Sequence, residues 1–164
     1  MTRRLILMRH AKSSWDHPGH EDHARPLNGR GRHSASALGD WLRVHDYIPD
    51  QIISSSSQRT RETCAGLQLD VTADFTPRLY HAGPDDMHDE LTQATGRTVL
   101  MLGHNPGIAW FAEMLVEQPP SHARFHDYPT CATLVADFPI DDWAQIQMGT
   151  AQVADFITPR ELTG

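Results

Sequence analysis

The sequence contains no hydrophobic stretch long enough to cross a membrane. The unbroken apolar runs, such as residues 5–8 and 108–112, are at most five residues long, whereas a membrane-spanning helix needs about 20 such residues. The apolar part of a signal peptide needs about 7 to 15. We therefore expect a cytoplasmic protein without a membrane partner.

Cysteine is scarce, with Cys64 and Cys131 the only two in the chain. They do not form a CxxC pair, so the sequence has no disulfide framework and none of the paired thiols typical of redox or zinc sites. Free, buried thiols in a reducing compartment are the simplest interpretation.

Basic residues are in the minority: 14 Lys and Arg stand against 21 Asp and Glu, for a formal net charge of -7. A general nucleic-acid binder needs a basic surface, so we expect no nucleic-acid partner. Any anionic ligand must be held by a local cluster of cations.

The length of 164 residues fits one globular domain, because a chain of this size buries roughly 70% of its unfolded surface. Neither an internal repeat nor a linker divides it, so we expect one domain over residues 1–164. Nothing in the sequence indicates an oligomeric state. Histidine is unusually frequent, with 11 copies, and it is the residue of metal sites and of acid, base and nucleophilic chemistry.

Strand and helix patterns alternate along the chain. Continuous apolar runs and short alternating segments predict strands, and apolar residues at helical spacing predict helices. The expected strands cover residues 5–8, 51–54, 74–75, 98–102, 133–138 and 152–157, and the expected helices cover 28–44, 58–68, 85–93 and 108–115, with a short helical turn near Trp143. Such alternation predicts an α/β fold, a three-layer α/β/α sandwich around a mostly parallel sheet.

Arginines and histidines follow these expected strands directly. Arg9 and His10 come after the first strand, Arg59 comes after the serine-rich end of the second, and His104 comes after the strand at 98–102. Ligands of such folds bind outside the carboxyl ends of the strands. We therefore expect these four side chains to meet in one crevice.

The expected crevice suits a phosphoryl group. Arginine presents a planar set of donors that matches phosphoryl oxygens, and a neutral imidazole is a competent nucleophile toward phosphorus. A second histidine would donate to an oxygen on which charge builds up in the transition state. Positioning and charge stabilisation suffice for phosphoryl transfer, so we expect neither a metal nor another cofactor.

Four ordered motifs support a more specific interpretation. They are residues 7–13 (LMRHAKS), residues 25–28 (RPLN) with Gly31, residues 55–63 (SSSQRTRET) and residues 103–107 (GHNPG). In this order the motifs resemble the histidine phosphatase superfamily, in particular its SixA-like phosphohistidine phosphatases. The resemblance implies a phosphoglycerate mutase-like fold and a phosphorylated protein or a small phosphorylated molecule as substrate.

The resemblance also implies roles for individual residues. His10 would be the nucleophile that becomes phosphorylated, and Arg9, Arg59 and His104 would complete the phosphate pocket. Asp16 stands where many superfamily members have a polar pocket residue. The residues expected at the mouth of the site are Lys12, Ser13 and Arg25.

One departure from the superfamily bears on the substrate. Many members carry a glutamate two residues after a central leucine, as general acid to the leaving group. Here the stretch reads Leu79, Tyr80, His81, so His81 replaces the glutamate. Imidazole leaves from phosphohistidine with less help than an alkoxide leaves from an ester, which favours phosphohistidine as substrate. His81 or Asp16 could still supply a proton.

Three alternatives remain open at this point. The first is a broad-specificity phosphomonoesterase of the same superfamily, and the second is a non-catalytic adaptor that binds phosphate. The third is a metal site built from His17, His20 and His23, because imidazoles at such spacing can bind zinc. In addition, the polar loop at residues 119–128 could frame the substrate entrance or be an ordinary surface connection.

Overall fold

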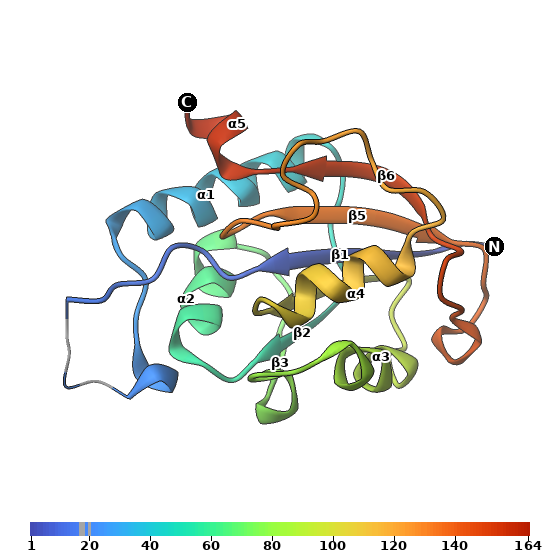
Figure 1. Ribbon diagram of the computed structural model, residues 1–164, viewed down its shortest axis with the longest axis horizontal. Helices are drawn as coiled ribbons and strands as arrows, with labels where there is room; N and C mark the ends of the chain where they lie inside the picture. The colour runs from blue at the N-terminus through green and yellow to red at the C-terminus, as the bar shows by residue number, and fades with distance from the viewer. Residues whose placement is uncertain (17–18, 20) are drawn as a thin grey trace.

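Six strands form a single mixed sheet in the computed structural model, which describes residues 1–16, 19 and 21–164 (Figure 1). The strands are β1 (Arg3–Arg9), β2 (Gln51–Ser55), β3 (Ala73–Thr76), β4 (Thr98–Gly103), β5 (Thr133–Phe138) and β6 (Gln152–Ile157), in the spatial order β3-β2-β4-β1-β5-β6. The first four of that order pair in parallel, and β5 is antiparallel to both of its neighbours. The prediction of a mostly parallel sheet is confirmed.

Helices cover both faces of the sheet, as the sequence predicted. One layer contains α1 (Gly29–Val44), α2 (Gln58–Leu67) and the short α5 (Pro159–Thr163), and the other contains α3 (Pro84–Thr92) and α4 (Gly107–Leu115) (Figure 1). The architecture is therefore a three-layer α/β/α sandwich. Only α5 has no counterpart among the helices expected from the sequence.

The central strands contribute side chains to two hydrophobic cores. Ile6 and Met8 of β1 pack beneath α1 and α2, whereas Leu5 and Leu7 pack beneath α3 and α4. Side chains alternate between the two faces of a strand, so a strand covered on both faces needs apolar residues throughout. This requirement explains the continuous apolar run at the start of the chain.

The first helix begins where the sequence predicted. The Asn28 side chain caps α1 by accepting a hydrogen bond from the Gly31 amide at 2.8 Å. Gly31 itself packs against the segment after β1, because a Cβ at this position would lie 2.1 Å from the carbonyl oxygen of Lys12. The start of α1 therefore lies directly beside the segment that follows Arg9 and His10.

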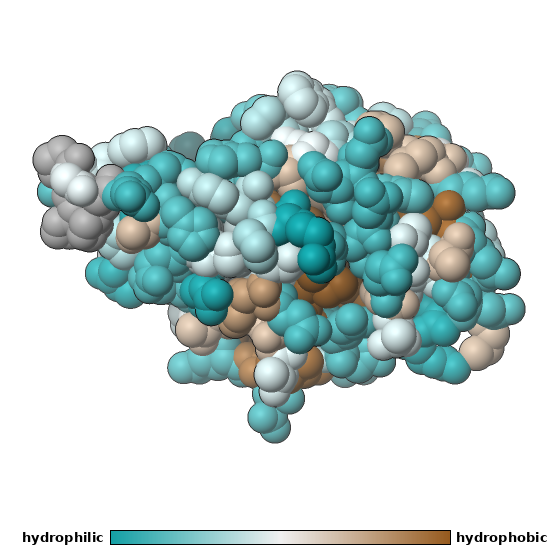
Figure 2. Space-filling view, turned by 90° about the horizontal axis from the view of Figure 1, so that it is seen from below, coloured by the Kyte–Doolittle hydropathy of each residue, from teal (hydrophilic) through white to brown (hydrophobic). Residues whose placement is uncertain are grey.

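The surface seen in Figure 2 is largely hydrophilic, with hydrophobic atoms confined to small areas among polar side chains. The larger exposed hydrophobic residues include Trp15, and Trp110 with Met114 on the outer face of α4. Within the described part of the chain, no helix combines the length and apolarity that crossing a membrane requires.

Candidate active site

The carboxyl ends of three parallel strands meet at one edge of the sheet. Arg9 ends β1 and is followed by His10, Arg59 lies in the first turn of α2 after β2, and His104 follows β4. These residues surround a cavity of about 250 Å³. Its lining consists of Arg9, His10, Lys12, Ser13, Trp15, Asp22, Arg25, Arg59, His81, His104, Asn105 and Thr130. The convergence expected from the sequence is present.

His10 is buried and held in a single orientation. Its Nδ1 lies 2.7 Å from the carbonyl oxygen of Ala11, and because a carbonyl can only accept a hydrogen bond, Nδ1 carries the proton. Burial lowers the pKa of His10 to about 3, and the positive charges of Arg9 and Arg59 act in the same direction. At neutral pH the ring is therefore uncharged, with a free electron pair on Nε2.

His104 faces His10 across the cavity, with the two ring centroids 5.2 Å apart. Its Nε2 lies 2.8 Å from the hydroxyl oxygen of Ser55, and that oxygen also accepts from the Ser57 amide. The Ser55 hydroxyl has no other acceptor among the described residues, so it donates to Nε2, which leaves the proton of His104 on Nδ1. Burial lowers the pKa of His104 to about 2, so this ring too is uncharged at neutral pH.

Three buried nitrogens of this site have no hydrogen-bond partner among the described residues: Arg9 Nε, Arg59 Nε and His104 Nδ1. An unpaired buried donor costs about 1 to 3 kcal/mol, so such groups are rare in folded proteins and call for an explanation. All three belong to residues that the sequence assigned to phosphate binding. Their combined chemistry, two guanidinium donors and one imidazole donor, fits the oxygens of a phosphoryl group.

Asp22 is a member of the site that was not expected from the sequence. It lies in a 3-10 turn (Asp22–Ala24), and its carboxylate accepts hydrogen bonds from Tyr80 at 2.5 Å, Arg25 at 3.1 Å and Arg59 at 3.1 Å. These bonds, that from Tyr80 above all, hold the pKa of Asp22 well below its ordinary value. The carboxylate therefore stays ionised and is unsuited to act as a general acid.

His81 lies at the rim of the cavity with an exposed side chain. Its backbone has a φ of +57°, an unusual conformation for a residue with a side chain. The ring centroid lies 3.9 Å from that of Tyr80, with the two planes tilted by 41°, and its Nε2 lies 3.9 Å from the Asp22 carboxylate.

The residues that the sequence placed at the mouth of the site and Asp16, expected in the pocket, have different outcomes. Lys12, Ser13 and Arg25 line the cavity, and Arg25 also lies flat over the exposed Trp15 ring at 3.5 Å. Asp16 is exposed and does not contribute to the lining. The structure therefore provides Asp22, six residues later, as the carboxylate that contacts the pocket arginines.

The alternative of a metal site rests partly on residues beyond the described ranges. His17 and His20 lie outside them, and His23 bonds to the Ser56 hydroxyl at 2.9 Å. In residues 1–16, 19 and 21–164 there is no group of three or more His, Cys, Asp or Glu side chains placed to hold a metal ion.

Comparison with known proteins shows the family of the chain. The family model described as "Histidine phosphatase superfamily (branch 1)" matches residues 5–83. The uncharacterized protein Rv1276c of Mycobacterium tuberculosis is 32% identical over 160 residues, which cover 93% of this chain and 100% of that protein. The chain belongs to the histidine phosphatase superfamily, branch 1. A further relative, the uncharacterized chloroplastic protein At3g52155 of Arabidopsis thaliana, is 33% identical over 130 residues, covering 70% of this chain and 60% of that one.

Solved structures place this histidine phosphatase superfamily member beside SixA proteins. The structure of SixA from Nakamurella multipartitia, a candidate phosphohistidine phosphatase, superimposes with a TM-score of 0.82 at 28% identity and covers 97% of each chain. The counterpart from Agrobacterium tumefaciens gives 0.78 at 26% identity, covering 96% of this chain and 98% of the other. A protein histidine phosphatase SixA complexed with tungstate shares the fold, with a TM-score of 0.74 at 19% identity and coverage of 98% and 99%.

Proposed function

We propose that this protein hydrolyses phosphohistidine in a protein substrate through a covalent phosphohistidine formed on His10. The observation that carries the proposal is the convergence of His10, Arg9, Arg59 and His104 on one cavity. His10 has a free electron pair on Nε2, and Arg9 Nε, Arg59 Nε and His104 Nδ1 are donors without a partner among the described residues. One nucleophile and three oxygen-binding donors are what an in-line phosphoryl transfer requires.

In the first step, Nε2 of His10 forms a bond to phosphorus while the bond from phosphorus to the substrate imidazole breaks. The departing imidazole nitrogen takes up a proton from solvent. In the second step, water attacks phosphorus, the bond to Nε2 breaks, and His10 returns to its neutral form as inorganic phosphate leaves. The water proton passes to solvent or to the released phosphate, so both steps balance. The protein supplies position and charge and needs no metal for this sequence.

The surroundings of the cavity favour a phosphoramidate over an ester. Asp22 is the carboxylate nearest the pocket arginines, and hydrogen bonds from Tyr80, Arg25 and Arg59 keep it ionised. Asp16, the other carboxylate considered, does not line the cavity. An alkoxide leaving group needs a strong proton donor, whereas imidazole leaves with less assistance.

The contact between His81 and Asp22 is the observation in favour of the second candidate function, a phosphomonoesterase. The ring of His81 lies at the cavity rim with Nε2 3.9 Å from the Asp22 carboxylate, and a protonated His81 could donate to an ester oxygen. In that case a His81→Ala variant would lose activity on phosphomonoesters much more than on phosphohistidine.

The test is to incubate the protein with a phosphohistidine peptide carrying labelled phosphate, in excess chelator, and to quench the reaction rapidly. We expect acid-labile, alkali-stable label on the native chain together with phosphate release. His10→Ala should lose both, with a fall in turnover of at least about 1,000-fold. His88→Ala, which removes a half-buried histidine of α3 outside the cavity lining, is the matched control and should behave like the native protein.

Each alternative predicts a different outcome of the same experiment. A metal-dependent hydrolase would lose activity in chelator, and phosphate release that survives His10→Ala would exclude the covalent step. Binding of phosphate without any turnover would indicate an adaptor. A clear preference for phosphomonoesters in kcat/KM would replace the proposed substrate.

A further inference from the structure

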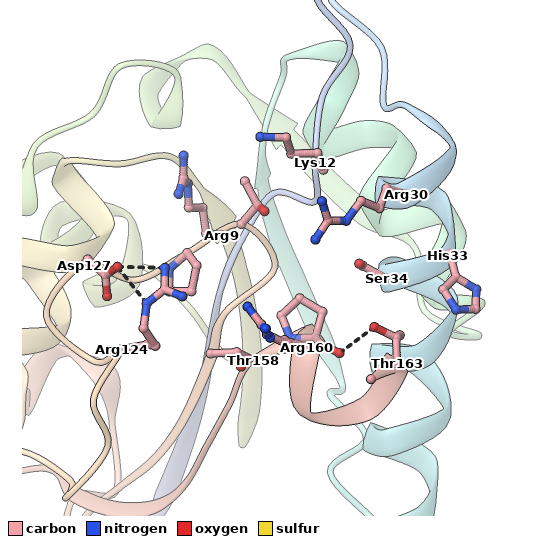
Figure 3. Close-up of a pocket in the computed structure, with 14 residues that line it drawn as sticks. Arg9, Lys12, Arg30, His33, Ser34, Arg124, Asp127, Thr158, Arg160 and Thr163 are labelled. Carbon is pink, nitrogen blue, oxygen red and sulfur yellow. Dashed lines mark hydrogen bonds and ion pairs between the residues drawn. The ribbon is translucent and has the colours of Figure 1, made fainter.

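A second and larger cavity adjoins the candidate active site. Its volume is about 610 Å³, and it is lined by residues from α1, from the loop before β5 and from α5 (Figure 3). We name it the basic groove, because its charged lining consists of Arg9, Lys12, Arg30, Arg124 and Arg160 with one acidic side chain, Asp127. This composition is the reverse of that of the whole chain, which has a net charge of -7.

Most of the positive charge in the basic groove is uncompensated. Arg124 is paired with Asp127 at 2.8 Å. Lys12, Arg30 and Arg160 form no ion pair with any residue that the structure describes. Figure 3 shows Arg9 and Arg124 on one side of the opening, Lys12 and Arg30 on the other, and Arg160 of α5 between them. Lys12 is also the only lysine in the sequence.

The position of Arg30 adds a second reason to expect an anion. Arg30 and Arg32 lie within the first four residues of α1, and the first turn has no acidic residue. The positive end of a helix dipole repels cations, so this arrangement disfavours the helix in the isolated protein. An anion bound in the groove would offset that repulsion.

The basic groove and the candidate active site are continuous. Arg9, Lys12 and Thr130 line both cavities. A ligand whose phosphoryl group lies against His10 therefore extends past these residues into the groove. The ligand must carry negative charge beyond its phosphoryl group to match the lining.

We propose that the basic groove binds acidic residues that flank the phosphohistidine of a protein substrate. This inference rests on the proposed function and specifies its substrate class. A polypeptide fits better than a small molecule, because small ligands are usually enclosed, whereas the groove's Lys12, Arg30, Arg124 and Arg160 are exposed. They come from separate segments of the chain, so an extended peptide in the groove can contact them one after another.

The first measurement compares two phosphohistidine peptides that differ only in the flanking residues, Asp and Glu in one and Asn and Gln in the other. We expect a KM about tenfold lower for the acidic peptide, with kcat changed less than about twofold. The advantage should shrink as salt concentration rises, because salt screens exposed charges. Equal kcat/KM values for the two peptides would overturn the inference and leave the proposed function intact.

Charge-reversal variants then locate the effect. Arg30→Glu and Arg160→Glu should each raise KM for the acidic peptide by about fivefold and leave the neutral peptide unaffected. Arg30→Glu should at the same time raise Tm, because an acidic residue favours the start of a helix. The matched control is Arg97→Glu, an exposed position just before β4 and thus at the opposite end of that strand from the site. An equal KM increase in the control would contradict a specific groove.

A binding experiment separates failure of the inference from failure of the proposed function. The unphosphorylated acidic peptide should protect Lys12 from acetylation, followed by mass spectrometry, whether or not the protein turns over phosphohistidine. Absence of protection would overturn the inference. Protection by inorganic pyrophosphate at concentrations where the peptide gives none would assign the groove to a small anion and would overturn it as well.

Discussion

The Asp22 carboxylate lies 3.1 Å from Nη2 of Arg59, although 37 residues separate the two in the chain. The backbone carbonyl of Asp22 also accepts from Nη1 of Arg59 at 2.8 Å. Each terminal nitrogen of the guanidinium thereby donates to Asp22, and Nε is left without a partner among the described residues. Asp22 thus acts as a positioning residue for the donor that we assign to phosphate binding.

Replacing Asp22 with asparagine tests this positioning role. Asp22→Asn keeps an oxygen that can accept from Arg59 but removes the charge that holds Arg59 and Arg25 together. We expect kcat/KM on phosphohistidine to fall about tenfold, because the guanidinium of Arg59 loses its fixed orientation. Asp40 forms an (i,i+3) ion pair with Arg43 on the outside of α1, as Asp22 does with Arg25. Asp40→Asn removes the charge from that pair and should leave kcat/KM unchanged. An equal effect of the two variants would contradict the assignment.

The ionised state of Asp22 predicts how stability depends on pH. Its pKa in the folded protein lies below the ordinary value of 3.8, so on acidification the unfolded chain takes up the proton first. The stabilising contribution is therefore present above about pH 4 and is lost as the pH falls further. The difference in Tm between the native protein and Asp22→Asn should be constant from pH 7 to 5 and should shrink below pH 4. A difference in Tm that grows on acidification would contradict a lowered pKa of Asp22 in the folded protein.

The neutral state of His10 predicts its nuclear magnetic resonance signature. Burial lowers its pKa to about 3 from an ordinary value of 6.5, so its ring should not titrate between pH 5 and 8. Nitrogen chemical shifts should show a protonated Nδ1 and an unprotonated Nε2 throughout that range. Because the unfolded chain binds the proton more readily, this burial also lowers stability progressively from about pH 6.5 downward. A titration of His10 near pH 6.5 in the folded protein would refute the assignment.

The hydroxyl of Ser55 is expected to hold His104 in its working orientation. Ser55→Ala removes the donor that lies 2.8 Å from Nε2 of His104, and kcat should fall about tenfold as the ring loses its fixed tautomer. Ser54→Ala removes a neighbouring hydroxyl that bonds to the carbonyl of Ser55. Both variants should lose about 1 kcal/mol of stability, but only Ser55→Ala should lose activity. Equal kcat values would assign a purely structural role to Ser55.

A pair of glycine variants tests the packing of α1 against the segment after β1. Gly31→Ala would place a Cβ 2.1 Å from the carbonyl oxygen of Lys12, so we expect a loss of about 3 kcal/mol in the free energy of unfolding. In Gly29→Ala the nearest such atom is the terminal nitrogen of Arg32 at 3.7 Å. That variant should match or exceed the native stability, because alanine favours helix over glycine. Denaturant unfolding of both variants gives the comparison.

The two arginines and two histidines of the site could be predicted because each stands immediately after a strong local pattern. Arg9 and His10 follow a continuous apolar run, and His104 follows another. Parallel strands of one sheet present their carboxyl ends at the same edge, so the order of elements sufficed to bring these side chains together. Arg59 could be predicted for the same reason, because it lies at the start of α2, directly after the serine-rich end of β2.

Asp22 and the basic groove could not be predicted in this way. Asp22 lies in a short 3-10 turn without a strand pattern before it, and the sequence argument placed Asp16 in the pocket instead. Arg30, Arg124 and Arg160 of the groove come from α1, the loop before β5 and α5, and each taken alone has the features of an ordinary surface residue.

Local periodicity, capping residues and strand order are properties of neighbouring residues, and they already specified the α/β sandwich, the start of α1 at Asn28 and the edge at which Arg9, His10 and His104 meet. Contacts between turns and loops depend instead on how the finished layers pack, which no local pattern encodes. The tertiary structure alone therefore placed Asp22 against Arg59 and joined Arg30, Arg124 and Arg160 into one groove beside the candidate active site.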